Sequence, residues 1–417
     1  METHLLPELL ATAQGQRADE ILRSCVHCGF CQATCPTYQV LGDELDSPRG
    51  RIYLIKQVLE GAQVTEKTRQ HLDQCLTCRN CETTCPSGVK YGELIDIGRS
   101  VVEAKTTRSW RARGLRMLLK EGLTSRWVKP AFAVGRAVKP LLPAVLQKKL
   151  PDARPAGALP TRQHARKVLL LAGCVQPAML PSIDAATLRV LDAVGVQGMV
   201  ASGSGCCGAL KHHMNDVEGG LAAMRANVDV WYPLILSGAV EAIVMNASGC
   251  GATVREYDHH LAHDAAYAAK AKVVAAKVMD VSEYLGQFAD QLKPLLKNNT
   301  VKASFHPPCT LQHWQKLRPV TEGLLAHCGV ALQPFAESHL CCGSAGAYSV
   351  MHPKIATELR DRKLGHIAAA APQVILSANI GCITHLQSGT ATPVLHWVEW
   401  VDAQLQPSKQ PSEMATA

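Results

Sequence analysis

Two cysteine motifs of identical spacing constrain this chain more than any other feature. The pattern C-x2-C-x2-C-x3-C-P runs from Cys25 to Pro36 and again from Cys75 to Pro86. Its eight cysteines are Cys25, Cys28, Cys31, Cys35, Cys75, Cys78, Cys81 and Cys85. A cubane cluster takes one thiolate on each of its four irons, and in two-cluster ferredoxins the fourth cysteine of this motif binds the other cluster. The spacing therefore predicts two [4Fe–4S] clusters with crossed ligands.

Crossed ligation gives each cluster three cysteines of one motif and one of the other. The expected sets are Cys25, Cys28 and Cys31 with Cys85, and Cys75, Cys78 and Cys81 with Cys35. Structural zinc is the alternative, but zinc sites use two separated C-x2-C pairs, which three cysteines in a row at x2 spacing match poorly. Helical patterning between the motifs, beginning at Ser47-Pro48, favours an α-helical ferredoxin domain.

The other nine cysteines lie within residues 174–382, in a region with an internal duplication. In both copies 31 residues separate a cysteine at the end of an apolar segment from a Cys-Cys-Gly turn, and a Gly-Cys pair follows. The eight cysteines of the repeat are Cys174, Cys206, Cys207 and Cys250, then Cys309, Cys341, Cys342 and Cys382. Strand patterns alternating with helical ones predict two α/β units with parallel sheets, which bind ligands at their strand ends.

The repeated motifs resemble the cysteine-rich domain of heterodisulfide reductases and of respiratory dehydrogenase iron–sulfur subunits. The fullest form of that domain has a fifth cysteine per unit, where this chain has Thr253 and His385. Four cysteines suffice for a further cluster, a metal ion or a thiol redox site, and reduced, buried cysteines are the alternative. The second unit is the better candidate, because His306 and His385 could add ligands. Cys328 is interpreted as a small core residue.

These patterns divide the chain into four regions. They are an α-helical ferredoxin domain (1–104), a basic, Pro-rich helical linker (105–165), and two Cys-Cys-Gly α/β units (166–290 and 300–405). Residues 105–154 contain 13 Lys or Arg against two acidic residues, a net charge of +11, which leaves −3 for the rest of a chain whose net charge is +8. Trp110 and Trp127 are interleaved with these cations. That composition is typical of a helix on anionic lipid, and a linker packed on its own protein is the alternative.

No apolar stretch approaches the ~20 residues of a spanning helix, and the polar N-terminus lacks a secretory pattern. We therefore expect the protein in a reducing cytosol, where disulfides are disfavoured and clustered cysteines bind metal or do redox work.

Taken together, the motifs resemble the iron–sulfur subunits of bacterial glycolate oxidases (glycolate dehydrogenases). The resemblance covers Cys25–Tyr38, Ser47–Glu60, Cys75–Lys90, Ala247–Tyr257, and Ser338–Ala347 with Ala378–His385. It implies an oxidoreductase complex whose partner subunits bind FAD and oxidise glycolate to glyoxylate. Electrons would leave through this chain toward quinone or another membrane acceptor, at the cytoplasmic face of the inner membrane.

Three alternatives of the same class remain. They are the equivalent subunits of lactate-oxidising complexes, of anaerobic glycerol-3-phosphate dehydrogenase and of heterodisulfide reductase. A nucleic-acid-binding protein with structural clusters would use the basic segment on phosphates and lose affinity steeply with salt; we expect no nucleic-acid partner. We predict no catalytic residue, because the chain shows neither a flavin fingerprint nor groups placed for hydride abstraction.

Overall fold

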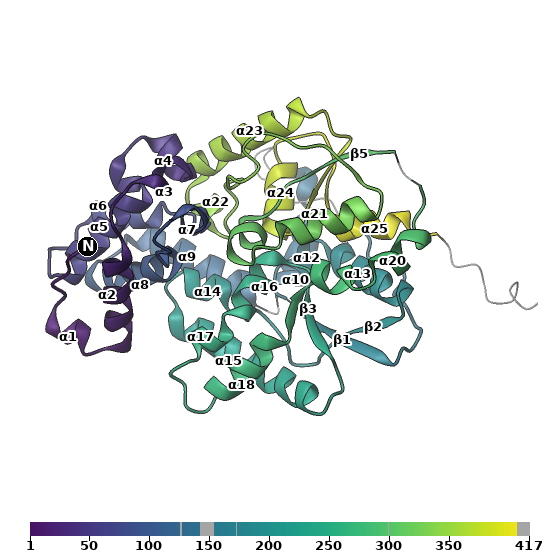
Figure 1. Cartoon of the computed structure of the whole chain (residues 1–417), viewed down its shortest axis with the longest axis horizontal. Coiled ribbons are helices and arrows are strands. Elements are labelled where there is room, and N and C mark those ends of the chain that lie inside the picture. Colours follow the sequence, from purple (N-terminus) through teal and green to yellow (C-terminus); the bar gives the residue numbers. More distant parts are fainter. Residues whose placement is uncertain (126, 142–153, 172, 299, 407–417) are drawn as a thin grey trace, which may run out of the picture.

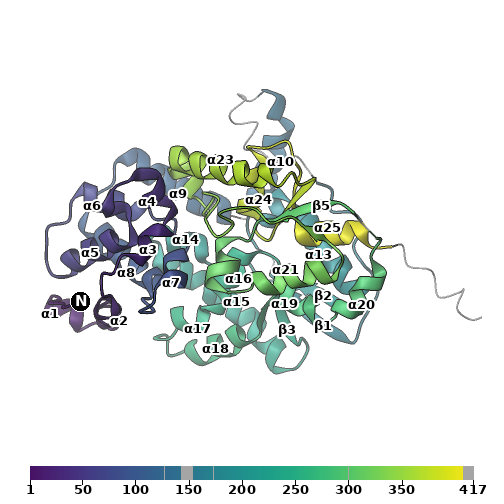
Figure 2. The ribbon, with the colours of Figure 1, turned by 45° about the horizontal axis from the view of Figure 1, so that its top comes forward.

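The computed structural model describes residues 1–125, 127–141, 154–171, 173–298 and 300–406. A helical domain built from the N-terminal part of the chain lies at one end of the molecule, beside a larger α/β region (Figure 1 and Figure 2). The helices of this domain are α1 (Pro7–Leu10), α2 (Ala13–Ser24), α3 (Phe30–Ala33), α4 (Pro36–Leu41), α5 (Pro48–Leu59), α6 (Glu66–Asp73), α7 (Asn80–Thr84) and α8 (Tyr91–Lys105).

Helix α5 forms the centre of the helical domain. Its start is the predicted one: the Ser47 hydroxyl accepts a hydrogen bond from the Gly50 amide at 3.0 Å, and Pro48 takes the first turn, where no amide donor is needed. The buried face of α5 packs on α8 so closely that a Cβ atom at Gly98 would lie 2.5 Å from Ile55. The prediction of an α-helical ferredoxin domain is confirmed.

The basic segment forms two helices, α9 (Trp110–Thr124) and α10 (Val128–Ala137), followed by a 3-10 turn over Lys139–Leu141. One face binds the rest of the protein, where Arg116 donates to the Met214 carbonyl at 3.0 Å and Lys120 to Asp216 at 2.8 Å. The other face exposes 72% of Trp110 and 69% of Leu118. The predicted linker thus packs on its own protein and also keeps an exposed apolar face. Residues 126 and 142–153 of this segment lie outside the described residues.

The first α/β unit has a four-stranded parallel sheet of order β2-β1-β3-β4. Its elements are β1 (Arg166–Leu170), α12 (Gln176–Met179), α13 (Pro181–Ala193), β2 (Val196–Val200), α14 (Ala209–His213), α15 (Val217–Leu236), β3 (Ala242–Met245), α16 (Ser248–Arg255), α17 (Tyr257–His260), α18 (Ala268–Ala276), β4 (Val278–Asp280), α19 (Val281–Gly286) and α20 (Ala289–Leu292).

The second unit repeats that order as β6-β5-β7-β8, again all parallel. Its elements are β5 (Lys302–Phe305), a π-helical turn (Thr310–Trp314), α21 (Arg318–His327), β6 (Ala331–Leu332), α22 (Tyr348–Met351), α23 (Pro353–Ala369), β7 (Val374–Ser377), α24 (Ile380–Gln387), β8 (Val394–His396) and α25 (Trp397–Gln404). The predicted fold class, a helical ferredoxin domain followed by a duplicated parallel α/β domain, is confirmed.

The two units share one hydrophobic core, in which α13 of the first packs on α25 of the second. Arg189 of α13 and Asp402 of α25 form an ion pair at 2.6 Å, and Trp397 is fully buried between the units. Cys328 belongs to this core, as its interpretation as a small core residue predicts. Among the described helices, none is both long and apolar enough to cross a membrane.

Candidate iron–sulfur sites

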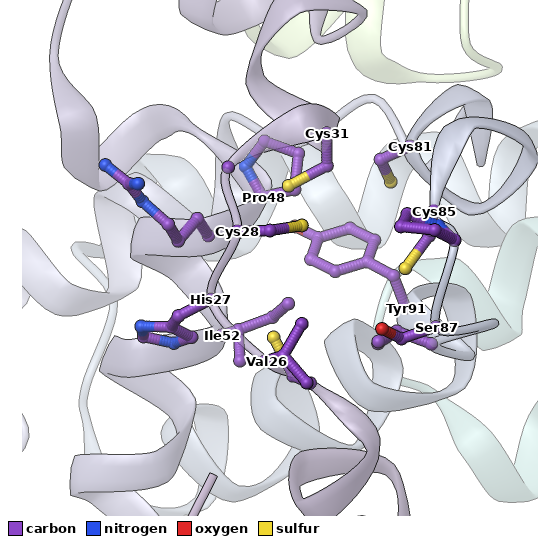
Figure 3. Close-up of a pocket in the computed structure, with 15 residues that line it drawn as sticks. Val26, His27, Cys28, Cys31, Pro48, Ile52, Cys81, Cys85, Ser87 and Tyr91 are labelled. Carbon is purple, nitrogen blue, oxygen red and sulfur yellow. The ribbon is translucent and has the colours of Figure 1, made fainter.

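A cavity beneath the first cysteine loop brings together cysteines of both motifs. Cys25, Cys28, Cys31 and Cys85 line it together with Cys81. Figure 3 shows the sulfur atoms of Cys28 and Cys31 directed into this space from one side and that of Cys85 from the other, beside the Tyr91 ring. These four cysteines are one of the two sets that crossed ligation predicts.

A second cavity lies deeper in the domain, where Cys35, Cys75, Cys78 and Cys81 line it. Cys81 borders both cavities, and the thiols that act on it electrostatically are those of the second. Burial raises the pKa of the Cys81 thiol well above its usual value, and the thiols of Cys78, Cys75 and Cys35 add to the shift. The structure thus places all eight predicted ligands around two cavities, although the assignment of each to a cluster remains a prediction.

The loops curl around the cavities because two residues in each adopt left-handed backbone angles. In the first loop these are His27 and Gly29, with φ of 55° and 84°, and in the second Thr77 and Arg79, with φ of 52° and 56°. Only glycine adopts this conformation without strain, so Arg79 must be held by its surroundings. Its guanidinium pairs with Glu256 and stacks 3.4 Å from the centre of the Trp314 ring.

The spacing of the sulfur atoms matches a cluster better than a zinc ion. Two ligands of a tetrahedral zinc ion, with Zn–S bonds of about 2.3 Å, are about 3.8 Å apart. Among the described residues, the groups of three whose ligand atoms all lie within 4.8 Å of one another include none of these eight cysteines. Four thiols spread around a cavity suit the one-thiolate-per-iron pattern of a cubane cluster.

One buried arginine lines the second cavity, and another is hydrogen-bonded to the loop of Cys75. Arg51, 1% exposed, lines the cavity and donates to Thr37 at 3.1 Å and to Asp46 at 3.2 Å. Arg99 donates to the Cys75 carbonyl at 2.6 Å and to Thr77 at 2.8 Å. Such cations offset the negative charge of thiolates in a low-dielectric interior. The first cavity instead opens at the surface, where Cys28 is exposed.

In both α/β units the Cys-Cys-Gly turn ends in a glycine that no other residue could replace without strain. Gly208 and Gly343 have φ of 89° and 87°. A Cβ atom at these positions would lie 2.7 Å from the Gly220 carbonyl oxygen and 2.5 Å from that of Ala356. In this turn the amide of Gly343 donates to the sulfur of Cys341 at 3.4 Å. The amide of Gly208 donates in the same way to the sulfur of Cys206.

The four cysteines of the second unit gather with His306 in the interior. Ligand atoms of His306, Cys342 and Cys382 lie within 4.8 Å of one another. Within the part of the chain that the structure describes, neither ring nitrogen of the fully buried His306 has a hydrogen-bond partner. Lys363, 2% exposed, lies close enough to Cys309 and its neighbours for their charges to interact. Burial lowers the pKa of Lys363 to about 8. The unpaired nitrogens of His306 and the nearby thiols are possible metal ligands, and the buried charge of Lys363 would offset the negative charge of thiolates. This combination suits a bound metal centre.

The other predicted ligand of this unit, His385, points elsewhere: its Nε2 atom lies 3.0 Å from the Ala356 carbonyl oxygen. In the first unit, the sulfur atoms of Cys174, Cys206, Cys207 and Cys250 lie close to one another, and the Gly208 amide donates to that of Cys206. Leu171 stands where the second unit has His306, three residues before the first cysteine. The second unit therefore has the richer donor set.

The second cavity and the second unit are in direct contact, which the sequence did not predict. The Cys309 thiol lies against the sulfur of Cys78 as well as that of Cys341. Leu76 and Tyr348 complete the apolar contact around these sulfur atoms. Residues 78 and 309 are far apart in the sequence, and no periodicity or spacing indicates that they meet. Two cysteine sites are therefore adjacent across the domain boundary.

Family models match the same regions. A 4Fe-4S dicluster domain matches residues 21–89, and a cysteine-rich domain matches residues 168–255 and 303–387. The fold and its paired cysteine cavities define an iron–sulfur electron-transfer protein. The glycolate oxidase iron–sulfur subunit of Escherichia coli K12 is 50% identical to this chain over 412 residues, 97% of this chain and 100% of that protein. The chain belongs to the family of glycolate oxidase iron–sulfur subunits.

More distant relatives are similar to parts or most of the chain. The probable glycolate oxidase iron–sulfur subunit of Bacillus subtilis is 28% identical, with 90% of both chains covered. Lactate utilization protein A of Geobacillus kaustophilus is 27% identical over 57% of this chain and 99% of its own length.

Proposed function

We propose that this chain carries electrons out of a glycolate-oxidising complex whose partner subunits bind the FAD. The observation that supports this most is the identity of 50% to a glycolate oxidase iron–sulfur subunit along the full length of both proteins. When bound, [4Fe–4S] clusters would supply one-electron carriers, whereas oxidation of a hydroxy-acid needs a two-electron acceptor such as a flavin. The chain is therefore an electron conduit and does not itself oxidise glycolate.

The exposed side of the first cavity is the surface we assign to the flavin-bearing partner. Val26 and Phe30, 67% and 63% exposed, flank the exposed Cys28. Apolar side chains on a protein surface become favourable contacts when a partner covers them. From this surface, electrons would pass from the first cavity to the second, which adjoins Cys309 of the second unit.

Membrane quinone is the proposed acceptor, reached at the cytoplasmic face of the inner membrane. The exposed face of α9 and α10, with Trp110, Met117, Leu118 and Trp127, supports such a peripheral contact. Exposed Arg111 and Arg113 on the same segment suit anionic headgroups, since each cation near such a surface contributes about 1 kcal/mol.

The purified complex tests the proposal. Glycolate should bleach the flavin and reduce both clusters, seen by optical and electron paramagnetic resonance spectroscopy. In Cys28→Ala or Cys78→Ala complexes the flavin should still be bleached, while delivery to quinone should stop. Turnover of glycolate by the flavin-free chain with an artificial acceptor would show that the conduit role is wrong.

Lactate oxidation is the second candidate, because a lactate utilization protein matches the chain over 57% of its length. Lactate and glycerol-3-phosphate therefore serve as matched substrates in the same experiment. If either one reduces the clusters and glycolate does not, the electron-transfer role stands and the substrate changes.

A further inference from the structure

Three metal-binding side chains meet where the ferredoxin domain touches the first α/β unit, outside the cysteine sites. Asp96 lies on α8, and His212 and His213 are the last residues of α14. One ligand atom of each lies within 4.8 Å of the others, and Nδ1 of His213 is 3.8 Å from Oδ1 of Asp96. Two nitrogen or oxygen ligands of a tetrahedral zinc ion, bound at about 2.0–2.1 Å, are about 3.3 Å apart. Small side-chain rotations would therefore bring the three atoms onto one ion.

Within the described ranges of the chain, neighbouring rings pack against His213 and His212 and leave one ring nitrogen of His213 without a hydrogen bond. Nδ1 of His213 is buried and has no hydrogen-bond partner among the described residues. The edge of this ring meets Trp314 at a centroid distance of 6.0 Å, and His260 packs against His212 at 4.6 Å. Nδ1 of His213 faces the Asp96 carboxylate at 3.8 Å, an ion-pair distance that is too long for a hydrogen bond, whereas buried ring nitrogens normally have a closer partner.

We propose that Asp96, His212 and His213 bind one divalent transition-metal ion of the zinc class. Two imidazoles and one carboxylate are a ligand set of zinc and of non-haem iron, and no thiolate takes part. The ion would be separate from the iron–sulfur sites and would join α8 of the ferredoxin domain to α14 of the first unit. This site goes beyond the proposed electron transfer and does not depend on it.

Zinc uptake by the full-length, cluster-loaded chain tests the site. The chain is purified anaerobically, equilibrated with buffered Zn²⁺, and its zinc and iron are counted by mass spectrometry. We expect one tightly bound zinc in the wild type and an affinity at least about tenfold lower in Asp96→Asn and His213→Gln. His259→Gln is the matched control, since His259 is an exposed histidine of the same neighbourhood, and it should bind zinc as the wild type does. Unchanged iron content in every variant shows that the fold and the clusters are intact.

X-ray absorption at the zinc edge separates this site from the cysteines. The proposal requires a shell of nitrogen and oxygen only. Sulfur in that shell, equal zinc binding by the wild type and His213→Gln, or no zinc uptake by the wild type would each overturn it.

Discussion

Cys35 and Cys85 each end one cysteine loop but line the cavity of the other loop. We therefore predict that Cys35→Ala damages the cluster held by Cys75, Cys78 and Cys81 and spares the other, because one iron of that cluster loses its thiolate. Iron content and the electron paramagnetic resonance signals of the two reduced clusters measure this.

Cys328→Ala is the control for Cys35→Ala. Cys328 is a buried cysteine of the α/β core, outside the cavities, so its loss should leave both signals unchanged. Damage from Cys35→Ala that is confined to the first cluster would contradict crossed ligation.

The buried charge of Arg51 gives a second prediction at this scale. Arg51→Met should lower the reduction potential of the second cluster by about 50–100 mV, because one charge at several ångströms and an effective dielectric constant of about 20 contributes about 2 kcal/mol. Redox titration followed by electron paramagnetic resonance gives both potentials. Arg51→Lys keeps the charge and should shift the potential much less. Equal shifts in the two variants would mean that the lost contacts to Thr37 and Asp46, and not the charge, set the potential.

At the scale of elements, α9 and α10 have one face on the protein and one toward solvent. Arg116 and Lys120 hold the inner face, so a test of membrane binding must use the outer one. Arg111→Glu with Arg113→Glu should release the complex from anionic vesicles at low salt, measured by vesicle sedimentation.

The same charge change elsewhere provides the control for the vesicle experiment. Lys272 and Lys277, exposed near the end of α18, can both be changed to Glu, and that variant should still bind the vesicles. If the wild-type complex never sediments with vesicles at low salt, the exposed face of α9 and α10 does not contact the membrane.

Sequence patterns predicted the elements well where a local rule fixes them. The Ser47-Pro48 helix start and the glycine of each Cys-Cys-Gly turn depend on neighbours within a few residues, and the sequence pattern shows them. Contacts between segments far apart in the chain could not be predicted from the sequence pattern. The Cys78–Cys309 contact and the meeting of Asp96 with His213 arise only when the domains pack.

In the candidate site, too, the sequence predicted local features and missed those that depend on tertiary packing. The cysteine spacing predicted two crossed sets of thiols, and each set lines one of the two cavities, while the ligands of each cluster stay a prediction. It did not separate His306 from His385, since the direction of each ring depends on tertiary packing. His306 lies beside Cys342 and Cys382, whereas Nε2 of His385 lies 3.0 Å from the Ala356 carbonyl oxygen.

At the scale of the whole molecule, a cluster in the second unit would extend the series of sites beyond Cys78. We predict that anaerobically purified protein holds more iron than the about eight atoms of two cubane clusters, and that Cys342→Ala removes the excess. Cys207→Ala, the equivalent change in the first unit, is the matched control and should remove less. Iron limited to two cubanes, with all nine later cysteines reactive as free thiols on unfolding, would favour reduced, buried cysteines.

The contacts of Arg79 have a consequence for how the protein matures. A chain emerges from the ribosome N-terminus first, and the residues that line the first cavity lie within residues 25–91. The second cavity is lined by residues within 35–91, but its loop also contacts residues made much later: the Arg79 guanidinium contacts Glu256 and Trp314, and Cys78 adjoins Cys309. We therefore expect the nascent chain to acquire its surface cluster first, and the inner one only after the C-terminal half has folded against it.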